Sequence, residues 1–163
     1  MAELIAAFSA DVEALCQELC TGKISVSEWH LRMRRLVKRL HVAAALIAGE
    51  LRGELVEEQV REQFEYLAGF AESLREQGEI LCGPLIFRAL MYSGAAWATF
   101  WLVVEALEVE ATEVRWRLTP AEHCDDCLAL AARGWMLREQ LTQVPGDGQT
   151  ECLTNCRCYL EFR

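Results

Sequence analysis

Two groups of cysteines stand out near the end of the chain. Cys124 and Cys127 form a C-x-x-C pair, and a second cluster contains Cys152, Cys156 and Cys158. Between them, a turn-rich VPGDG sequence can fold the chain back on itself. Thiolates that converge from separate segments are the ligands of a tetrahedral Zn²⁺ site. The two groups therefore predict a structural zinc site.

The second cluster offers one cysteine more than a four-sulfur site needs. We expect Cys124, Cys127, Cys152 and Cys156 to bind the ion, with Cys158 as the substitute for either of the last two. The alternative is a pair of disulfides with one free thiol, or a set of buried unpaired thiols. Paired clusters at these spacings are a stronger signal of zinc than a lone C-x-x-C motif.

Cysteine usage elsewhere depends on the redox compartment. The first residues contain an acid and lack the basic and apolar regions of a signal peptide, so we expect a reducing compartment. Metal-binding or unpaired thiols are then favoured over disulfides, although disulfide-rich thermophile proteins are an exception. Cys16 and Cys20 lie one helical turn apart with no second pair nearby, so we interpret them as small core residues.

An enzymatic site is not expected. His123 precedes Cys124, and Asp125 and Asp126 follow, but residues adjacent in sequence rarely form a working Cys–His pair. The chain has no glycine-rich phosphate loop, H-E-x-x-H or G-x-S-x-G motif. A metal with four protein ligands also has no open position for water. We therefore predict no catalytic residues and a protein that is not an enzyme.

The composition is that of a folded protein. Of its 163 residues, 53% are hydrophobic and 25% are charged, which allows one domain with a small appendage. The formal net charge of −9 argues against a protein whose whole surface binds nucleic acid. One basic stretch remains, either as an ordinary solvated helix face or as a docking site for phosphate or an acidic partner: Arg32, Arg34, Arg35, Lys38, Arg39 and His41.

Three segments repeat apolar residues in steps of three and four, which predicts amphipathic helices packed as a bundle. We expect Gly22 to end the first helix, a capping box of Ser25 and Glu28 to open the second, and Gly78 to end the third. The expected inward residues are Leu4, Phe8, Val12, Leu15 and Leu19, then Trp29, Met33, Leu36, Leu40, Ala43 and Ile47, then Val56, Val60, Phe64, Leu67, Ala71 and Leu74.

An uncharged run from Ala89 to Val104 follows. It is shorter than the roughly 20 residues of a membrane span, so we interpret it as a buried central helix. Trp97, Phe100 and Trp101 bring a large apolar surface to this helix. Three short helices with one stripe each cannot cover all of it, so the remainder is expected to be an interface.

In the last part of the chain, the spacing of apolar residues changes from that of a helix to that of a strand. Glu113–Leu118 alternates polar and apolar residues, which predicts a strand. Cys156–Phe162 is a second candidate strand, with Cys158, Leu160 and Phe162 on one side. Two such short strands cannot bury enough apolar surface to be stable alone. A metal bound at the base of this β-ribbon can supply the missing stability.

The expected fold class is therefore mainly α. A helical, bundle-like body of about four helices is predicted over residues 1–110, and a small zinc-clipped β-ribbon is predicted over residues 111–163.

The cysteine-rich tail resembles the C-terminal segment of tailed-phage head-morphogenesis proteins, the minor capsid proteins of the Mu protein F-like group. The resemblance covers roughly Gly83 to Arg163, and the tail is its specific part. It is carried by Arg88-Ala89-Leu90-Met91-Tyr92-Ser93-Gly94-Ala95-Ala96, Trp116, His123-Cys124-Asp125-Asp126-Cys127-Leu128-Ala129-Leu130-Ala131, Gly134, Leu141, Pro145-Gly146-Asp147-Gly148, Thr150, Cys152, Asn155-Cys156-Arg157-Cys158 and Leu160-Glu161.

This resemblance implies a structural role without catalytic residues. Members of the group are low-copy head components associated with the portal, and they assist assembly or DNA packaging and retention. Many of them carry His at the position of Cys152. The implied location is the virion head or the head–tail neck, with the host cytoplasm as the place of assembly.

The partner that the resemblance implies is the portal or the major capsid protein. The uncovered apolar helix adds a second copy of the chain as an alternative, the basic stretch adds packaged DNA through Arg32, Arg35 and Arg39, and no membrane partner is expected. Two other functions stay open. One is a zinc-ribbon nucleic-acid module, since three arginines lie near the cysteines, and the other is a Cys/His-dependent enzyme. The three arginines are Arg115, Arg117 and Arg157.

Overall fold

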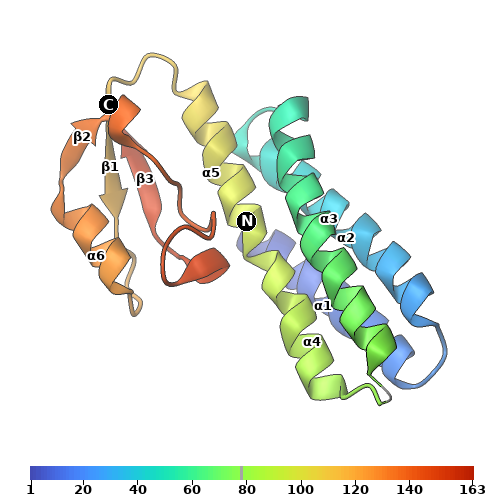
Figure 1. Ribbon diagram of the computed structural model, residues 1–163. Helices are drawn as coiled ribbons and strands as arrows, with labels where there is room; N and C mark the ends of the chain where they lie inside the picture. Colours follow the sequence, from blue (N-terminus) through green and yellow to red (C-terminus); the bar gives the residue numbers. More distant parts are fainter. Residues whose placement is uncertain (78) are drawn as a thin grey trace.

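The computed structural model describes residues 1–77 and 79–163. Helices from the first two thirds of the chain form one part, here called the helical body, and the last third forms a second part, the C-terminal module (Figure 1). The helical body contains α1 (Ala2–Cys20), α2 (Val26–Ala48), α3 (Gly53–Glu76), α4 (Cys82–Leu90), the 3-10 turn η1 (Met91–Ser93) and α5 (Ala95–Leu107). The C-terminal module contains β1 (Glu113–Arg117), α6 (Asp125–Ala132), β2 (Trp135–Leu137), η2 (Arg138–Gln140), η3 (Leu153–Asn155) and β3 (Tyr159–Phe162).

Local sequence signals set the ends of the first helices. Gly22 follows α1 with φ +68°, a left-handed conformation that glycine adopts without a steric penalty. The Ser25 hydroxyl caps α2 by accepting a hydrogen bond from the Glu28 amide at 3.2 Å. Both predicted boundaries are confirmed. Gly78, the expected end of α3, lies outside the described residues.

The core of the helical body follows the predicted stripes of α1 and α3. Phe8, Val12, Leu15 and Leu19 are buried, and Leu4 is half-buried. Of the predicted inward residues of α3, all are buried except the half-buried Phe64. The indole of Trp29 on α2 meets the Phe70 ring of α3 edge to face, with 5.5 Å between ring centroids.

The predicted stripe of α2 is only partly right. Val37 and His41 are fully buried, whereas Ile47, which we expected to face inward, is 50% exposed. The expectation that His41 lies on the solvated basic face is therefore wrong. The reason is that α2 packs against α1, α3 and α5, so its buried face is wider than one stripe and rotates along the helix.

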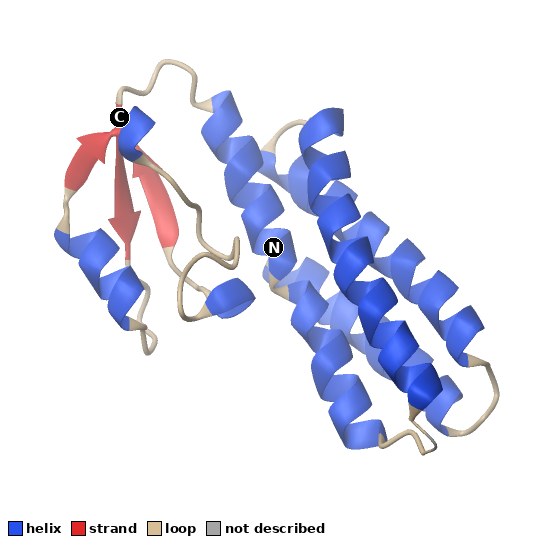
Figure 2. Ribbon diagram, viewed as in Figure 1, coloured by secondary structure: helices blue, strands red, loops and turns tan. Residues whose placement is uncertain are grey.

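The uncharged run forms part of a long helical segment, α4–η1–α5 (Figures 1 and 2). This segment belongs to the helical body, and α5 also lies next to the C-terminal module. By length and composition, Cys82–Leu107 is apolar enough to cross a membrane, and about a third of its most apolar window is buried. One side of α5 buries Val103 against Val56 and Val60. Its other side places Trp101 and Leu102 against the core of the C-terminal module.

The expectation of a wholly buried central helix is thus only partly met. The C-terminal module covers much of the α5 surface that three helices leave open. Trp97, Phe100 and Trp101 are half-buried and stack edge to face, with centroids 5.8 and 5.0 Å apart. The exposed apolar side chains of this segment lie instead on α4 and η1, at Phe87 (73% exposed) and Met91 (39% exposed).

The C-terminal module contains a three-stranded antiparallel sheet with the order β2-β1-β3. The predicted strand at Glu113 is confirmed as the central strand, and it places Trp116 opposite Leu160 of β3. On its other edge, β1 places Val114 opposite Met136 of β2. The sequence did not indicate β2 or α6, because three residues are too few to show a period and α6 is only two turns long.

A disulfide joins Cys20 at the end of α1 to Cys82 at the start of α4. The interpretation of Cys20 as a small unpaired core residue is therefore wrong. Cys16 remains a free, buried thiol, as expected. The pairing could not be read from the sequence because the two cysteines are 62 residues apart and meet only when α1 packs against α4.

The C-terminal module docks on the junction of η1 and α5. At Gly94, an added Cβ would lie 2.8 Å from the carbonyl carbon of Thr154 in η3, so only glycine allows this approach. At the other end of α5, the Arg138 guanidinium donates a hydrogen bond to Glu105 at 2.7 Å. The segment that carries Cys152 and Cys156 is therefore one of the segments that contact the helical body.

Candidate metal centre

The five cysteines of the tail come together at one point of the C-terminal module. Cys124 is the N-cap residue of α6 and Cys127 lies in its first turn, which places both sulfurs at the same end of the helix. Cys152 and Cys156 flank the short helix η3, and Cys158 directly precedes β3. The predicted convergence of the two cysteine groups is confirmed.

The sulfur–sulfur distances suit a shared cation. Cys152 Sγ lies 3.5 Å from both Cys124 Sγ and Cys127 Sγ, and Cys127 Sγ lies 3.6 Å from Cys156 Sγ. Tetrahedral zinc with bonds of about 2.3 Å to sulfur requires sulfurs about 3.8 Å apart. Since all five of these thiols are free, the residues present fit a metal site.

The cluster is surrounded by the apolar core of the module. Cys127, Cys156 and Cys158 are buried, and Cys124 and Cys152 are half-buried. Their packing partners include Val114, Trp116, Met136, Val144 and Leu160. Such a shell keeps water away from the three buried sulfurs, which favours a structural site over a site open to a substrate.

The thiols perturb one another strongly. A hydrogen bond from the Cys158 thiol lowers the pKa of Cys156 to about 5, and the same bond raises the pKa of Cys158. Burial, followed by bonds to neighbouring thiols, raises the pKa of Cys127. One sulfur therefore bears a negative charge that its neighbours stabilise with their protons, and a divalent cation can replace those protons.

Polar side chains tie the two cysteine groups together. Asp126 Oδ2 accepts a hydrogen bond from the Glu151 amide at 2.9 Å, and the Thr150 hydroxyl lies 3.2 Å from Cys152 Sγ. In the connecting turn, the Asp147 carboxylate accepts hydrogen bonds from the amides of Val144 and Gln149, at 2.8 and 2.9 Å. The turn that brings the second cluster back to the first is thus held by its own side chain.

His123 contacts one sulfur of the cluster, which we did not predict. Its Nδ1 lies 3.5 Å from Cys158 Sγ, and its Nε2 donates a hydrogen bond to the Thr119 carbonyl at 2.7 Å. The position of His123 directly before the C-x-x-C pair is the one local signal, but the partner of the imidazole is 35 residues away.

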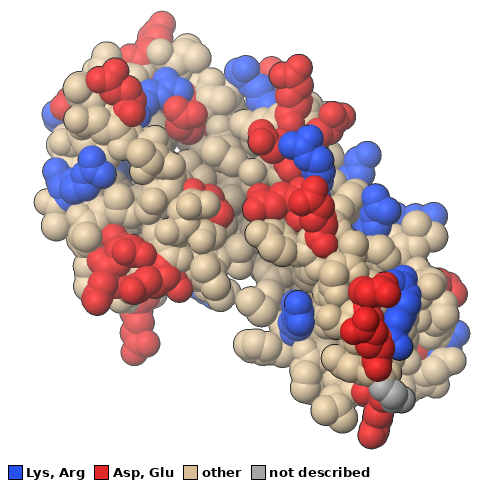
Figure 3. Space-filling model, viewed as in Figure 1, with Lys and Arg blue, Asp and Glu red and all other residues tan. Residues whose placement is uncertain are grey.

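The arginines beside the centre are largely paired. Arg115 and Arg117 both contact the Glu161 carboxylate across the sheet, at 2.5 and 3.5 Å. Arg163 pairs with Glu113 at 2.7 Å. On the face drawn in Figure 3, acidic and basic side chains are interspersed and no continuous basic area is visible. Of the three arginines predicted near the cysteines, Arg115 and Arg117 are thus paired and Arg157 is exposed. This leaves little free positive charge for a nucleic-acid backbone.

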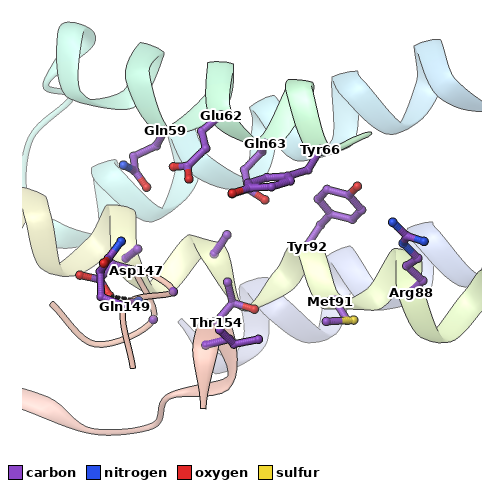
Figure 4. A pocket seen from close by; sticks show the side chains of 15 residues that line it. Gln59, Glu62, Gln63, Tyr66, Arg88, Met91, Tyr92, Asp147, Gln149 and Thr154 are labelled. Carbon is purple, nitrogen blue, oxygen red and sulfur yellow. Dashed lines mark hydrogen bonds between the residues drawn. The ribbon is translucent and has the colours of Figure 1, made fainter. Parts of the chain in front are cut away.

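A separate pocket of about 360 Å³ lies where the connecting turn meets the helical body. Figure 4 shows Tyr66, Tyr92 and Arg88 on one part of its wall and Asp147 and Thr154 on another. The Arg88 guanidinium stacks on the Phe70 ring, and Asp147 is occupied by backbone amides. Among the described residues that line this pocket there is no cysteine, serine or histidine.

Comparisons with protein-family models, curated proteins and solved structures give no match to this chain.

Proposed function

We propose that this protein is a non-enzymatic structural or assembly component of a bacteriophage head, a minor capsid or head-morphogenesis protein whose C-terminal module is held together by zinc. Cys124, Cys127, Cys152 and Cys156 bind the ion, and Cys158 can take the place of Cys152 or Cys156. The observation that carries the metal assignment is the convergence of these five sulfurs from separate segments in an apolar shell.

Zinc fits this centre better than a harder cation. Thiolate ligands select zinc, copper(I) or iron–sulfur clusters, whereas magnesium and calcium require oxygen ligands. The module is also small, with strands of three to five residues, and needs a cross-link to hold its sheet. Zinc supplies that cross-link between α6, η3 and the start of β3.

The role in a phage head rests on the resemblance of the tail to the Mu protein F-like group, and the surface of the helical body supports a protein partner. Phe87 and Met91 on α4 and η1 are exposed, and so are Leu81 beside them and Tyr66 on α3. An apolar surface of this kind marks a protein interface. We propose that the portal or the major capsid protein covers it, or a second copy of the chain.

Packaged DNA is a further proposed contact of the virion protein. Arg35 and Arg39 are exposed on α2, whereas Arg32 is engaged with Glu18 at 2.5 Å. A contact through these side chains would position the protein on phosphates without reading sequence. It would weaken steeply as the salt concentration rises, because each phosphate contact releases a counterion.

Metal analysis of the purified chain tests the first half of the proposal. We expect bound zinc in the wild type and its loss in Cys127→Ser, while Cys16→Ser keeps it because Cys16 lies in the helical body. Disulfides among the five tail cysteines in a chain without metal, measured by mass spectrometry under non-reducing conditions, would refute the zinc assignment.

Co-expression with the portal and major capsid proteins, followed by size-exclusion chromatography, tests the second half. We expect a complex that Phe87→Asp disrupts and that Leu46→Asp, at an exposed position on α2, leaves intact. A strictly monomeric chain that binds neither protein and is absent from purified particles would contradict the structural role.

A further inference from the structure

Two deeply buried polar side chains line the pocket of about 360 Å³ that lies beside the connecting turn. Gln63 of α3 is 8% exposed and Tyr92 of η1 is 7% exposed (Figure 4). Among residues 1–77 and 79–163, neither the Gln63 carboxamide nor the Tyr92 hydroxyl has a hydrogen-bond partner. Polar groups buried to this degree are normally hydrogen-bonded, so both are available to a ligand that enters the pocket.

The charged side chains at this pocket are already engaged or lie at its exposed rim. The Asp147 carboxylate accepts hydrogen bonds from two backbone amides, and the Arg88 guanidinium stacks 4.4 Å from the centroid of the Phe70 ring. Glu62 is exposed. A charged ligand group in the buried part would lose its water without gaining an opposite charge. The pocket therefore suits an uncharged group with a hydrogen-bond donor and an acceptor side by side, which is what a carboxamide pairs with.

The rim of the pocket carries large side chains that are open to water. Tyr66, Met91 and Leu153 all line the pocket and are all exposed. Tyrosine and methionine are enriched in protein interfaces. A small molecule confined to the pocket would leave these side chains in water, whereas a polypeptide seated in it also covers them. The rim thus favours a polypeptide over a free small molecule.

Leu153 also has an unfavourable backbone conformation. Its φ is +51°, and within the described part of the chain it is the one residue other than glycine with a positive φ. A leucine is disfavoured in this left-handed region because its Cβ crowds the following carbonyl oxygen, and strain of this kind clusters at binding sites. Here the strained residue is one that presents an exposed apolar side chain at the rim of the pocket.

We infer that this pocket is the anchor site of a protein–protein contact and that it takes an uncharged segment of a partner polypeptide. An amide of that segment forms hydrogen bonds with Gln63 and Tyr92. One of its apolar side chains packs against the buried Ala95 and Ala98 of the pocket wall, and the rest of the segment covers the exposed rim. The inference rests on the proposed function only for the identity of the partner, the portal or the major capsid protein.

An NMR titration of the full chain with N-acetyl-leucinamide tests the site, because this uncharged probe combines peptide-like amides with one apolar side chain. We expect shifts of the Gln63 side-chain amide and of the backbone amides of Gly146 and Gly148, which line the pocket. Gln63→Leu and Tyr92→Phe each remove one polar group and keep most of the shape, so each should weaken binding about tenfold.

Matched controls separate the pocket from the rest of the surface. Gln17→Leu and Tyr159→Phe make the same two changes outside the pocket and should bind the probe as the wild type does. Adenosine monophosphate is the second probe. Shifts at the pocket with this nucleotide and none with N-acetyl-leucinamide would overturn the inference in favour of a nucleotide site, and no shift with either probe would overturn it outright.

The co-expression experiment distinguishes the inference from the proposed function. We expect Gln63→Leu to weaken the complex with the portal or major capsid protein. A complex that this variant leaves intact, in a chain that does not bind N-acetyl-leucinamide, would overturn the inference and leave the proposed function standing. Specific binding of the probe without any complex would support the site and contradict the role in a phage head.

Discussion

His41 shows how a single buried side chain makes stability depend on pH. Its ring is fully buried in α2, and Nδ1 lies 2.6 Å from the Thr99 hydroxyl of α5. Burial lowers the pKa of His41 from 6.5 to about 4. Between these values the unfolded chain binds a proton that the folded chain does not, so stability is present above pH 6.5 and is lost as the pH falls towards 4.

We expect His41 to reduce the free energy of unfolding by about 2 kcal/mol between pH 7 and pH 5. Urea unfolding at the two pH values measures this loss. The double variant His41→Leu/Thr99→Val removes the titrating group without leaving the Thr99 hydroxyl unpaired, and it should be less sensitive to pH by that amount. An equal pH dependence in wild type and variant would show that His41 is not buried as a neutral ring.

The cysteines and histidines of the chain could be predicted from the sequence to different degrees. The five tail cysteines could be recognised because their spacing within each group is short and local. The roles of His123, Cys20 and His41 could not be predicted, because each depends on a partner far along the chain: Cys158, Cys82 and Thr99. Sequence periodicity describes one helix at a time and does not reveal which helices become neighbours.

Two substitutions in the helix α2 test which of its faces is buried. We expect Val37→Asp to cost about 3–5 kcal/mol, because Val37 is fully buried and the new charge has no partner. Ile47→Asp should change stability by no more than about 0.5 kcal/mol, since Ile47 is half-exposed. Thermal or urea unfolding compares the two. A larger cost at Ile47 than at Val37 would restore the single stripe that the sequence suggested.

The contact of η3 with the helical body gives a second prediction at this scale. Gly94→Ala should destabilise the protein by about 1–3 kcal/mol, because the new methyl group meets the Thr154 backbone and η3 must move. Gly69→Ala in α3 is the control. Nothing lies within 4 Å of a Cβ there, so it should stabilise the helix by up to about 1 kcal/mol. A neutral Gly94→Ala would mean that the C-terminal module does not dock at this position.

The elements themselves were largely predictable where their patterns are long. The first three helices and the central strand follow from clear periods and caps, as the Ser25 cap and the alternation from Glu113 show. The short elements α6 and β2 were missed because eight and three residues are too few to show a clear period. The covering of α5 by the C-terminal module is a tertiary property of the same kind.

At the scale of the whole molecule, the metal centre and the docking surface are parts of one segment. Cys152 and Cys156 flank η3, and Thr154 of η3 lies against Gly94 of the helical body. A metal that fixes both cysteines also fixes the segment that joins the two parts. Metal binding should therefore order the C-terminal module and its contact with α5, while the helices α1 and α4, which pack into the core of the helical body, depend on it little.

Hydrogen exchange of the reduced, metal-free chain, measured by mass spectrometry before and after addition of zinc, tests whether a metal orders the C-terminal module. We predict that zinc increases the protection of amides across residues 111–163 and leaves α1, α2 and α3 nearly unchanged. Exchange in residues 111–163 that is the same with and without zinc would contradict a metal-held module.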